Sequence, residues 1–251
     1  MSSYEFPFNE RIRTYLRLED LFTKVLHHVD DGHEYNHHAA LISILQMLDI
    51  IDRADLKMDL VQELERQKSY LQQLRGNPNI SETTLNTTIE KIEQSALALR
   101  GDNLKLGQAL RENDWLMSIK QRANIPGGVC EFDLPSYHHW LYLGEERRKK
   151  DFEVWLSRLM PMHQAIQTIL KILRGSGSIT HYVAHNGVFQ QLLNGVKPAQ
   201  LLRIEMENSV CFPEVSANKY AINIRFNSLD FVQKPKQCDH DVEFSMVICN
   251  F

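Results

Sequence analysis

The hydrophobic period changes once along this chain of 251 residues, and that change limits the folds open to it. Up to about residue 174, apolar residues recur every three or four positions, as in helices that bury one face. After residues 175–178, which read Gly-Ser-Gly-Ser, apolar and polar residues alternate, as in antiparallel strands with one face against a core. The sequence therefore predicts an α+β fold, with a mainly helical N-terminal domain followed by a small antiparallel β-domain.

The most regular helical pattern lies between residues 60 and 99. Two runs of mostly apolar positions advance by alternate steps of four and three: Leu60, Leu64, Gln67, Leu71 and Leu74, then Leu85, Ile89, Ile92, Ala96 and Leu99. Gly76 and Pro78 separate the runs, and both residue types favour the end of a helix. We therefore expect two long helices folded back as an antiparallel hairpin within a bundle, with Gln67 as one polar residue in the seam.

Other helical segments flank the hairpin. Asn9 is a candidate N-cap of the first helix, which we expect to end in a polar, His-rich break at residues 30–38. One amphipathic helix is predicted over residues 108–124, and it stops at Ile-Pro-Gly-Gly, where Pro126 and Gly127 suit a type II turn. The helical pattern resumes after residue 135, and Pro161 opens the last helix.

Three segments alternate as strands do, at residues 202–206, 220–226 and 242–248. In the second segment Arg225 lies between the core-facing Ile224 and Phe226, so we expect its side chain to reach solvent. The predicted division is a helical domain at residues 1–178, which carries the dimer contact, and a β-domain at residues 179–251. The first helix and residues 135–174 are candidates to pack on the β-domain.

Composition and charge exclude several classes of protein. Hydrophobic residues make up 43% and charged residues 24%, which is typical of a globular domain. The net charge of -4 provides no general attraction to nucleic acid or anionic lipid. We find neither an apolar run of about 18 to 20 residues, which a membrane-spanning helix needs, nor a secretory signal. The cysteines form no C-x-x-C pair, so we expect thiols in a cytoplasmic protein: Cys130, Cys211, Cys238 and Cys249.

A histidine cluster is the first candidate for special chemistry: His27, His28, His33, His37 and His38. His33 and His37 stand one helical turn apart, but no cysteine lies nearby. A zinc site needs three or four converging ligands, so we expect a solvated polar loop rather than a metal site. Residues 238–241, which read Cys-Asp-His-Asp, lie between apparent strands, and we expect a polar turn there as well.

Cys130, Asp133 and His138 are the second candidate, because they lie close together in the sequence. A nucleophilic cysteine usually takes its base from a distant segment, so this spacing does not favour catalysis. Residues 126–128, Pro-Gly-Gly, lack the following Lys-Ser/Thr of a phosphate-binding loop. We expect no catalytic site, no metal and no cofactor.

Basic residues gather at several places: Arg11, Arg13 and Arg17 in the first helix, Lys120 and Arg122 before the Pro-Gly-Gly turn, residues 147–150, and Lys219 and Arg225 around one strand. For each of these basic residues, the ordinary interpretation is a solvated charge on the protein surface. They become a binding surface only if the fold gathers them, which periodicity cannot establish.

Several segments, taken in order, resemble the ZapD family of bacterial cell division proteins. They are residues 8–19, 48–51, 63–67, 110–112, 121–122, 125–135, 138–141, 201–203 and 220–226. The most distinctive is Ile-Pro-Gly-Gly-x-Cys-x-Phe-Asp-Leu-Pro at residues 125–135. The resemblance runs nearly from one end of the chain to the other.

This resemblance implies a non-catalytic homodimer that binds the C-terminal tail of the tubulin-like protein FtsZ and bundles FtsZ protofilaments at the mid-cell division ring, promoting septum formation. It also implies that basic side chains between a helical domain and an antiparallel β-domain take the tail. The matching positions are Arg17, Arg111, Arg122, His138 and Arg225, with Lys219 as a further candidate. Asp114 stands where other members can carry a basic residue, so it inherits no binding role.

Two other classes of function stay open. One is an enzyme with a site in a cleft between the domains, although no motif points to it. The other is a nucleic-acid-binding adaptor that uses the basic residues 147–150. The net negative charge and the lack of a standard reader motif argue against the second class.

Overall fold

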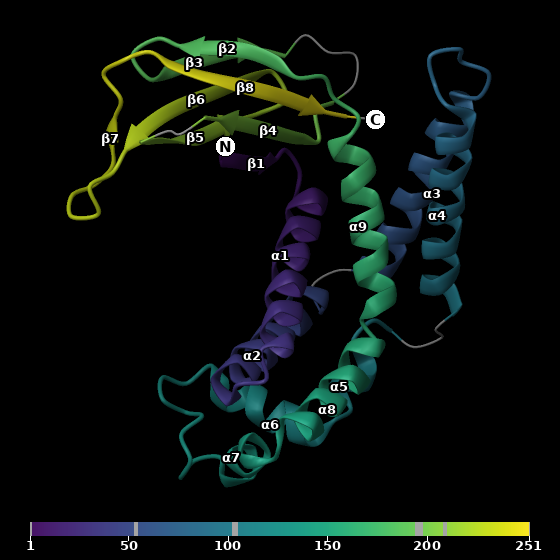
Figure 1. Ribbon diagram of the computed structural model, residues 1–251, viewed down its shortest axis with the longest axis vertical. Coiled ribbons are helices and arrows are strands. Elements are labelled where there is room, and N and C mark those ends of the chain that lie inside the picture. The colour runs from purple at the N-terminus through teal and green to yellow at the C-terminus, as the bar shows by residue number, and fades with distance from the viewer. Residues whose placement is uncertain (1, 53–54, 102–104, 194–197, 208–209, 251) are drawn as a thin grey trace. The chain divides into compact units, whose positions relative to one another are not determined.

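The computed structural model describes residues 2–52, 55–101, 105–193, 198–207 and 210–250, and these residues form nine α-helices and eight β-strands (Figure 1). They belong to two compact units. The helical unit is Thr14–Ile169, and the β-unit combines Met1–Arg13 with Leu170–Phe251. A helical region followed by antiparallel strands confirms the predicted α+β class.

The helices follow the predicted order closely. They are α1 Glu10–Asp30, α2 Glu34–Ile51, α3 Leu56–Gln73, α4 Glu82–Gly101, α5 Gln108–Arg111, α6 Asp114–Ala123, α7 Pro135–Tyr142, α8 Glu145–Ser157 and α9 Met160–Arg174. Asn9 caps α1 as expected, because its Oδ1 accepts a hydrogen bond from the Ile12 backbone N–H at 2.9 Å. No helix among these residues is long and apolar enough to cross a membrane.

The hairpin predicted from the two apolar runs is present as α3 and α4. The seam residues Leu60, Leu64, Leu85 and Ile89 are buried, which accounts for the packing of one helix against the other. Gly76 ends the first arm with a φ of 78°, a left-handed conformation that glycine adopts without a Cβ clash.

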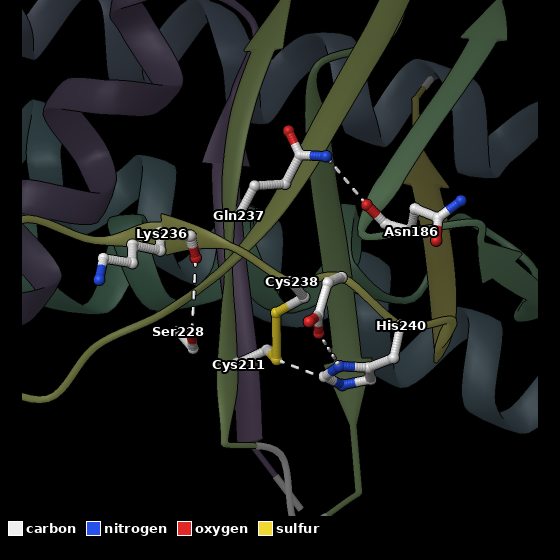
Figure 2. The surroundings of a disulfide bond; sticks show 8 residues. Asn186, Cys211, Ser228, Lys236, Gln237, Cys238 and His240 are labelled. Carbon is white, nitrogen blue, oxygen red and sulfur yellow. Dashed lines mark hydrogen bonds and ion pairs between the residues drawn. A yellow bond between two sulfur atoms is a disulfide. The ribbon is translucent and has the colours of Figure 1, made fainter.

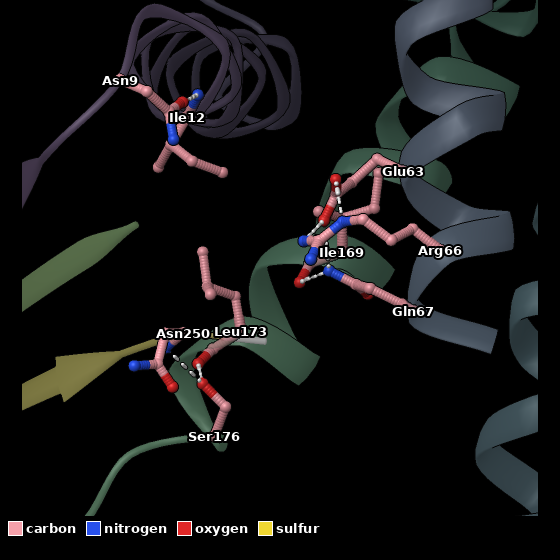
Figure 3. Close-up of polar contacts among 9 residues, drawn as sticks. All are labelled: Asn9, Ile12, Glu63, Arg66, Gln67, Ile169, Leu173, Ser176 and Asn250. Atoms are coloured by element: carbon pink, nitrogen blue, oxygen red, sulfur yellow. Dashed lines mark hydrogen bonds and ion pairs between the residues drawn. The ribbon is translucent and has the colours of Figure 1, made fainter. Parts of the chain in front are cut away.

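A buried polar contact lies on α3 at the seam (Figure 3). Glu63 and Gln67 are 1% and 0% exposed. Gln67 Nε2 donates to Glu63 Oε1 at 3.1 Å and to the carbonyl oxygen of Ile169 in α9 at 3.3 Å. Arg66 donates two hydrogen bonds to the Glu63 carboxylate, at 3.0 and 2.6 Å. The buried negative charge therefore has a cation one turn away, and Gln67 holds α9 beside α3.

Two helix boundaries differ from the sequence interpretation. The break expected at residues 30–38 is only three residues long, because His33 Nδ1 accepts from the Tyr35 N–H at 3.3 Å and caps α2. The single helix expected over residues 108–124 is divided into α5 and α6. The cause is Asn113, whose Oδ1 accepts from the Leu116 N–H at 3.0 Å and starts a new helix.

The strands are β1 Ser2–Pro7, β2 Thr180–Ala184, β3 Val188–Leu192, β4 Leu201–Met206, β5 Cys211–Ala217, β6 Ala221–Ser228, β7 Lys236–Gln237 and β8 Val242–Cys249. One antiparallel sheet has the order β1-β4-β8-β2, and the other has the order β3-β6-β5, with β7 paired to β6. Ile204, Phe244 and Met246 from the first sheet share a core with Ile224 and Phe226 from the second. The β-unit is therefore two sheets packed face to face.

Strand β1 was not predicted from the sequence, because its six residues show no clear alternation. It pairs antiparallel with β4, placing Glu5 opposite Arg203. The Glu5 carboxylate accepts two hydrogen bonds from Arg174 at the end of α9, at 2.8 and 2.7 Å. This two-point ion pair ties the N-terminal strand to the segment that leads into the sheets.

Three histidines are buried or half-buried in the helical unit. Burial lowers the pKa of His37, His38 and His163, because the imidazolium form loses hydration. His163 stacks on Phe22 with ring centroids 4.5 Å apart, and its buried Nδ1 has no hydrogen-bond partner within the described residues. All three side chains therefore favour the neutral form in the folded protein.

We expect the free energy of unfolding to fall as the pH drops below about 6.5, the ordinary histidine pKa. Below that pH the unfolded chain binds protons that the folded protein takes up only at lower pH, so acid favours unfolding. Urea unfolding at pH 8.0, 6.5 and 5.5 would measure the slope. His163→Phe keeps the ring against Phe22 and should flatten it, whereas His139→Phe, at an exposed site, should not. An unchanged slope in the first variant would contradict this assignment.

Candidate functional site

The most distinctive sequence block forms a compact loop between α6 and α7. Gly128 N–H donates to the Ile125 carbonyl at 2.8 Å, and Gly127 has a φ of 71°, so the predicted turn at Pro126 and Gly127 is confirmed. A Cβ at position 128 would lie 2.4 Å from the carbonyl oxygen of Arg122. Glycine at position 128 is therefore required by the close approach of the backbone to the end of α6.

Two candidate site residues hold this loop at its ends. Arg122 Nη1 lies 3.8 Å from Asp133 Oδ1, and His138 Nε2 lies 2.8 Å from the Val129 carbonyl oxygen. A carbonyl only accepts, so His138 carries its proton on Nε2 in this contact. The fold thus brings Arg122 and His138, which are 16 residues apart in the sequence, to the same loop.

Apolar side chains lie exposed on and beside the same loop. Ile125 is 50% exposed, Phe132 82% and Tyr142 63%. We call Arg122, Ile125, Phe132, His138 and Tyr142 the loop surface. Exposed aromatic and aliphatic groups next to cations are typical of surfaces that bind a protein or peptide segment. The loop surface suits an extended peptide with both apolar and acidic side chains.

Arg111 and Arg17 belong to the same unit but differ in their surroundings. Arg111 Nη1 lies 2.7 Å from Asp52, and its Nη2 donates to the Leu106 carbonyl at 2.6 Å. It is half-buried and acts within the fold as the link between α5 and the end of α2. Arg17 is exposed on α1.

Arg225 and Lys219 lie in the β-unit. The predicted alternation around Arg225 is confirmed, because Ile224 and Phe226 are fully buried and Arg225 is exposed. Its cross-strand neighbours are Val188 on β3 and Glu214 on β5. Lys219 is in the β5–β6 turn, with its Nζ 4.7 Å from the centroid of the Tyr220 ring.

The structure also joins two cysteines that the sequence analysis treated as thiols. Cys211 and Cys238 form a disulfide, 27 residues apart in the sequence, so the expectation of thiols is wrong for this pair (Figure 2). Cys130 is an exposed free thiol and Cys249 a buried one. The pair was missed because Cys211 begins β5, a strand that the sequence did not reveal, and only the sheet register brings it to Cys238.

Histidines that were candidates for special chemistry lie within hydrogen-bond distance of other groups in the fold. His37 Nε2 lies 3.2 Å from the Val29 carbonyl oxygen and His28 Nδ1 lies 3.0 Å from the Asn36 side chain. His138 directs its Nε2 to Val129 rather than to Cys130. Among the residues that the structure describes, the histidine cluster contributes no group of three converging metal ligands.

The family model for ZapD, described as a cell division protein, matches residues 16–225. The cell division protein ZapD of Dechloromonas aromatica is 51% identical over 100% of both chains. Those of Chromobacterium violaceum and Janthinobacterium are 47% and 45% identical, also over 100% of both chains.

The chain belongs to the ZapD family of cell division proteins. The resemblance noted in the sequence is therefore confirmed over the full length of the chain. Asp114 is the first residue of α6. An acidic side chain there interacts favourably with the positive end of the helix dipole, which gives this residue a local role in stability.

The basic run at residues 147–150 is mostly paired in this ZapD-family chain. Arg148 is 6% exposed. Its Nε donates to His37 Nδ1 at 2.8 Å, its Nη1 donates to the carbonyls of Leu141 and Leu143, and its Nη2 donates to the Gly32 carbonyl at 2.7 Å. Arg148 is thus an internal donor that holds four acceptors.

Lys149 and Arg147 are also engaged. Lys149 lies 2.6 Å from Glu145 and also donates to the Asp30 carbonyl, and Arg147 lies 3.3 Å from Asp151. The run therefore offers no open cluster of cations that would match a nucleic-acid backbone, which weakens the nucleic-acid alternative.

We expect Arg148→Met to lower the free energy of unfolding by at least about 3 kcal/mol, because it leaves several buried acceptors unpaired. Arg147→Met removes only an exposed ion pair and should change it by less than about 0.5 kcal/mol. Urea denaturation followed by circular dichroism would compare the two variants with the unchanged protein. Equal stabilities of the two variants would show that Arg148 does not organise this part of the fold.

Proposed function

We propose that the protein binds the C-terminal tail of FtsZ and cross-links FtsZ protofilaments into bundles, which promotes assembly of the division ring and septum. Membership of a cell division family supports the cellular role. The observation that carries the proposal is the loop surface, where Arg122 and His138 lie beside exposed Ile125 and Phe132. It combines the Arg122 cation and a polar imidazole with apolar area on the block that most resembles the family.

The loop surface has the chemistry that an acidic and apolar tail needs. Arg122 is half-exposed, and an incoming carboxylate can take two parallel hydrogen bonds from its guanidinium. Phe132 and Ile125 can bury apolar tail residues, at about 25 cal/mol per Å² removed from water. Arg17, Arg111, Arg225 and Lys219 are further proposed tail contacts, each to be tested separately, with Arg111 engaged most by its own fold.

Cross-linking follows if the protein is a homodimer with one tail site on each subunit. When one site is occupied, the second tail binds at a raised effective concentration, so two weak sites can join filaments firmly. We propose that the helical unit carries the dimer contact. Its hairpin exposes Met58 at 54% and Leu97 at 71%, apolar side chains that a partner could cover. This mode of action needs no cofactor and no catalytic step, and it locates the protein in the cytoplasm at the division ring.

We expect light scattering after size exclusion to give about twice the chain mass of 29.3 kDa. Leu97→Glu should shift the protein toward the monomer, because a charge would enter an apolar contact. Val154→Glu, at another exposed apolar position on a helix, is the matched control. A monomer at micromolar concentration in the unchanged protein would exclude bivalent cross-linking.

We expect co-sedimentation with polymerised FtsZ to require the FtsZ tail and to weaken as salt rises, because the proposed contacts are partly exposed. Arg122→Glu and Arg225→Gln should each weaken tail binding at least about tenfold, which corresponds to 1.4 kcal/mol. Glutamine is chosen at position 225 because a glutamate would face Glu214 across the sheet.

Arg158→Glu is the matched control for this experiment, since Arg158 is an exposed arginine that ends α8. It should bind the tail like the unchanged protein. Melting temperature and dimer mass should be the same in all variants. Undiminished binding by folded, dimeric Arg122→Glu would remove the loop surface from the proposed site, and binding to tail-less FtsZ would contradict the proposed partner.

A further inference from the structure

The corner of the β-unit around Cys211 and Cys238 contains a third metal-binding group, His240. The two sulfur atoms and one ring nitrogen of His240 lie within 4.8 Å of one another, the one such set of three among the described residues. Cys211 Sγ lies 3.9 Å from His240 Nε2 (Figure 2). We propose that, when the disulfide is reduced, these three side chains bind a zinc ion, with water as the fourth ligand.

The distances suit a tetrahedral ion. With Zn–S of about 2.3 Å and Zn–N of about 2.0 to 2.1 Å, a sulfur and a nitrogen on the same ion lie about 3.6 Å apart. The separation between Cys211 and His240 is close to that value. The two sulfurs would have to separate to about 3.8 Å. The Cα atoms are already 7.0 Å apart, so rotation of the two side chains can open the pair without moving the strands.

Asp239 prepares His240 to be a ligand. His240 Nδ1 lies 3.3 Å from Asp239 Oδ1, and a carboxylate only accepts, so the proton lies on Nδ1. That tautomer leaves the lone pair on Nε2, the nitrogen that faces Cys211. A carboxylate behind the metal-binding histidine is the usual arrangement in zinc proteins, since it fixes the ring and increases its basicity.

The surrounding backbone holds the two cysteine ligands together. Cys211 begins β5 opposite Ser228 of β6, and the Cys238 N–H donates to the Phe226 carbonyl at 2.9 Å. Gln237 Nε2 donates to the Asn186 carbonyl at 2.9 Å, which anchors the segment to the β2–β3 turn (Figure 2). The positions of the two cysteines are therefore set by backbone pairing and hydrogen bonds that do not depend on the ion.

The three ligands differ in burial, so an ion can reach the site from the side of the exposed histidine. Cys211 and Cys238 are 5% and 3% exposed, whereas the His240 side chain is 62% exposed. Two thiolates favour a soft or borderline cation such as Zn²⁺ over Mg²⁺ or Ca²⁺. From the sequence we expected only a polar turn at residues 238–241, because Cys211 is distant in the sequence and comes near them only through the pairing of β5 with β6.

Zinc binding requires that the disulfide is first reduced. A dithiol reductant supplies two electrons and two protons to the disulfide and becomes a disulfide itself, leaving two protein thiols. Zn²⁺ then replaces the two thiol protons, which pass to the solvent, and the imidazole binds without losing a proton. The disulfide and the zinc ion are alternative links between β5 and the segment after β7, since a sulfur in a disulfide is not a thiolate.

Titration of the reduced, metal-free protein with Zn²⁺ against a chromophoric chelator tests the site. We expect one ion per chain, and with Co²⁺ a thiolate-to-cobalt charge-transfer band. Cys211→Ser and Cys238→Ser should abolish that band, and His240→Ala and Asp239→Asn should each weaken Zn²⁺ binding at least about tenfold. Cys130→Ser and Cys249→Ser are matched controls and should bind normally. The oxidised protein should not bind.

A second measurement on the unchanged protein covers the case in which a cysteine variant does not fold. Alkylation of the reduced protein, read by mass spectrometry, should be slowed by Zn²⁺ at Cys211 and Cys238 but not at Cys130. Equal alkylation with and without Zn²⁺, or Zn²⁺ binding that survives the double change Cys211→Ser and Cys238→Ser, would overturn the proposal.

Discussion

The hydrogen bonds of the buried Arg148 guanidinium are the contacts on which the packing of α1, α2 and α7 depends. The guanidinium binds the turn between α1 and α2 through Gly32, the side chain of His37 on α2, and the end of α7 through Leu141 and Leu143. A cation so far from water is stable only when its donors are all used. The three chain segments are therefore required together, and α7 is fixed in the position from which it presents His138.

The spacing of apolar residues predicts long helices and strands, because each such element must place its apolar residues on the face that is buried. The hairpin of α3 and α4 could be predicted because the apolar residues of each helix must face those of the other for either helix to bury its apolar side. The division of α5 from α6 could not, since it depends on one capping side chain, Asn113, whose effect is local and weak in any sequence pattern. β1 could not be predicted either, because its six residues show no clear alternation and the strand it pairs with lies about 200 residues away.

The candidate site shows the same contrast. The turn at Pro126 and Gly127 could be predicted, because proline and glycine fit only a few backbone conformations. The partners of the basic residues could not, because Asp52 reaches Arg111 only through the packing of α2. The resemblance to ZapD supplied the residue positions, and the structure then separated Arg111, which holds the fold, from Arg122, which lies exposed at the loop.

Under the proposed function, the ion pair of Arg122 with Asp133 would let the loop surface bind and release a tail. At 3.8 Å between an exposed arginine and a partly exposed aspartate, the pair contributes about 0 to 1 kcal/mol. A tail carboxylate that replaced Asp133 on Arg122 would therefore lose little in the exchange, and the net gain would come from apolar residues that cover Phe132 and Ile125. A single contact of this kind is weak and sensitive to salt. In the proposed dimer, two such contacts would be strong only when two tails are within reach, so the proposed cross-linking would depend on the density of FtsZ tails along neighbouring filaments.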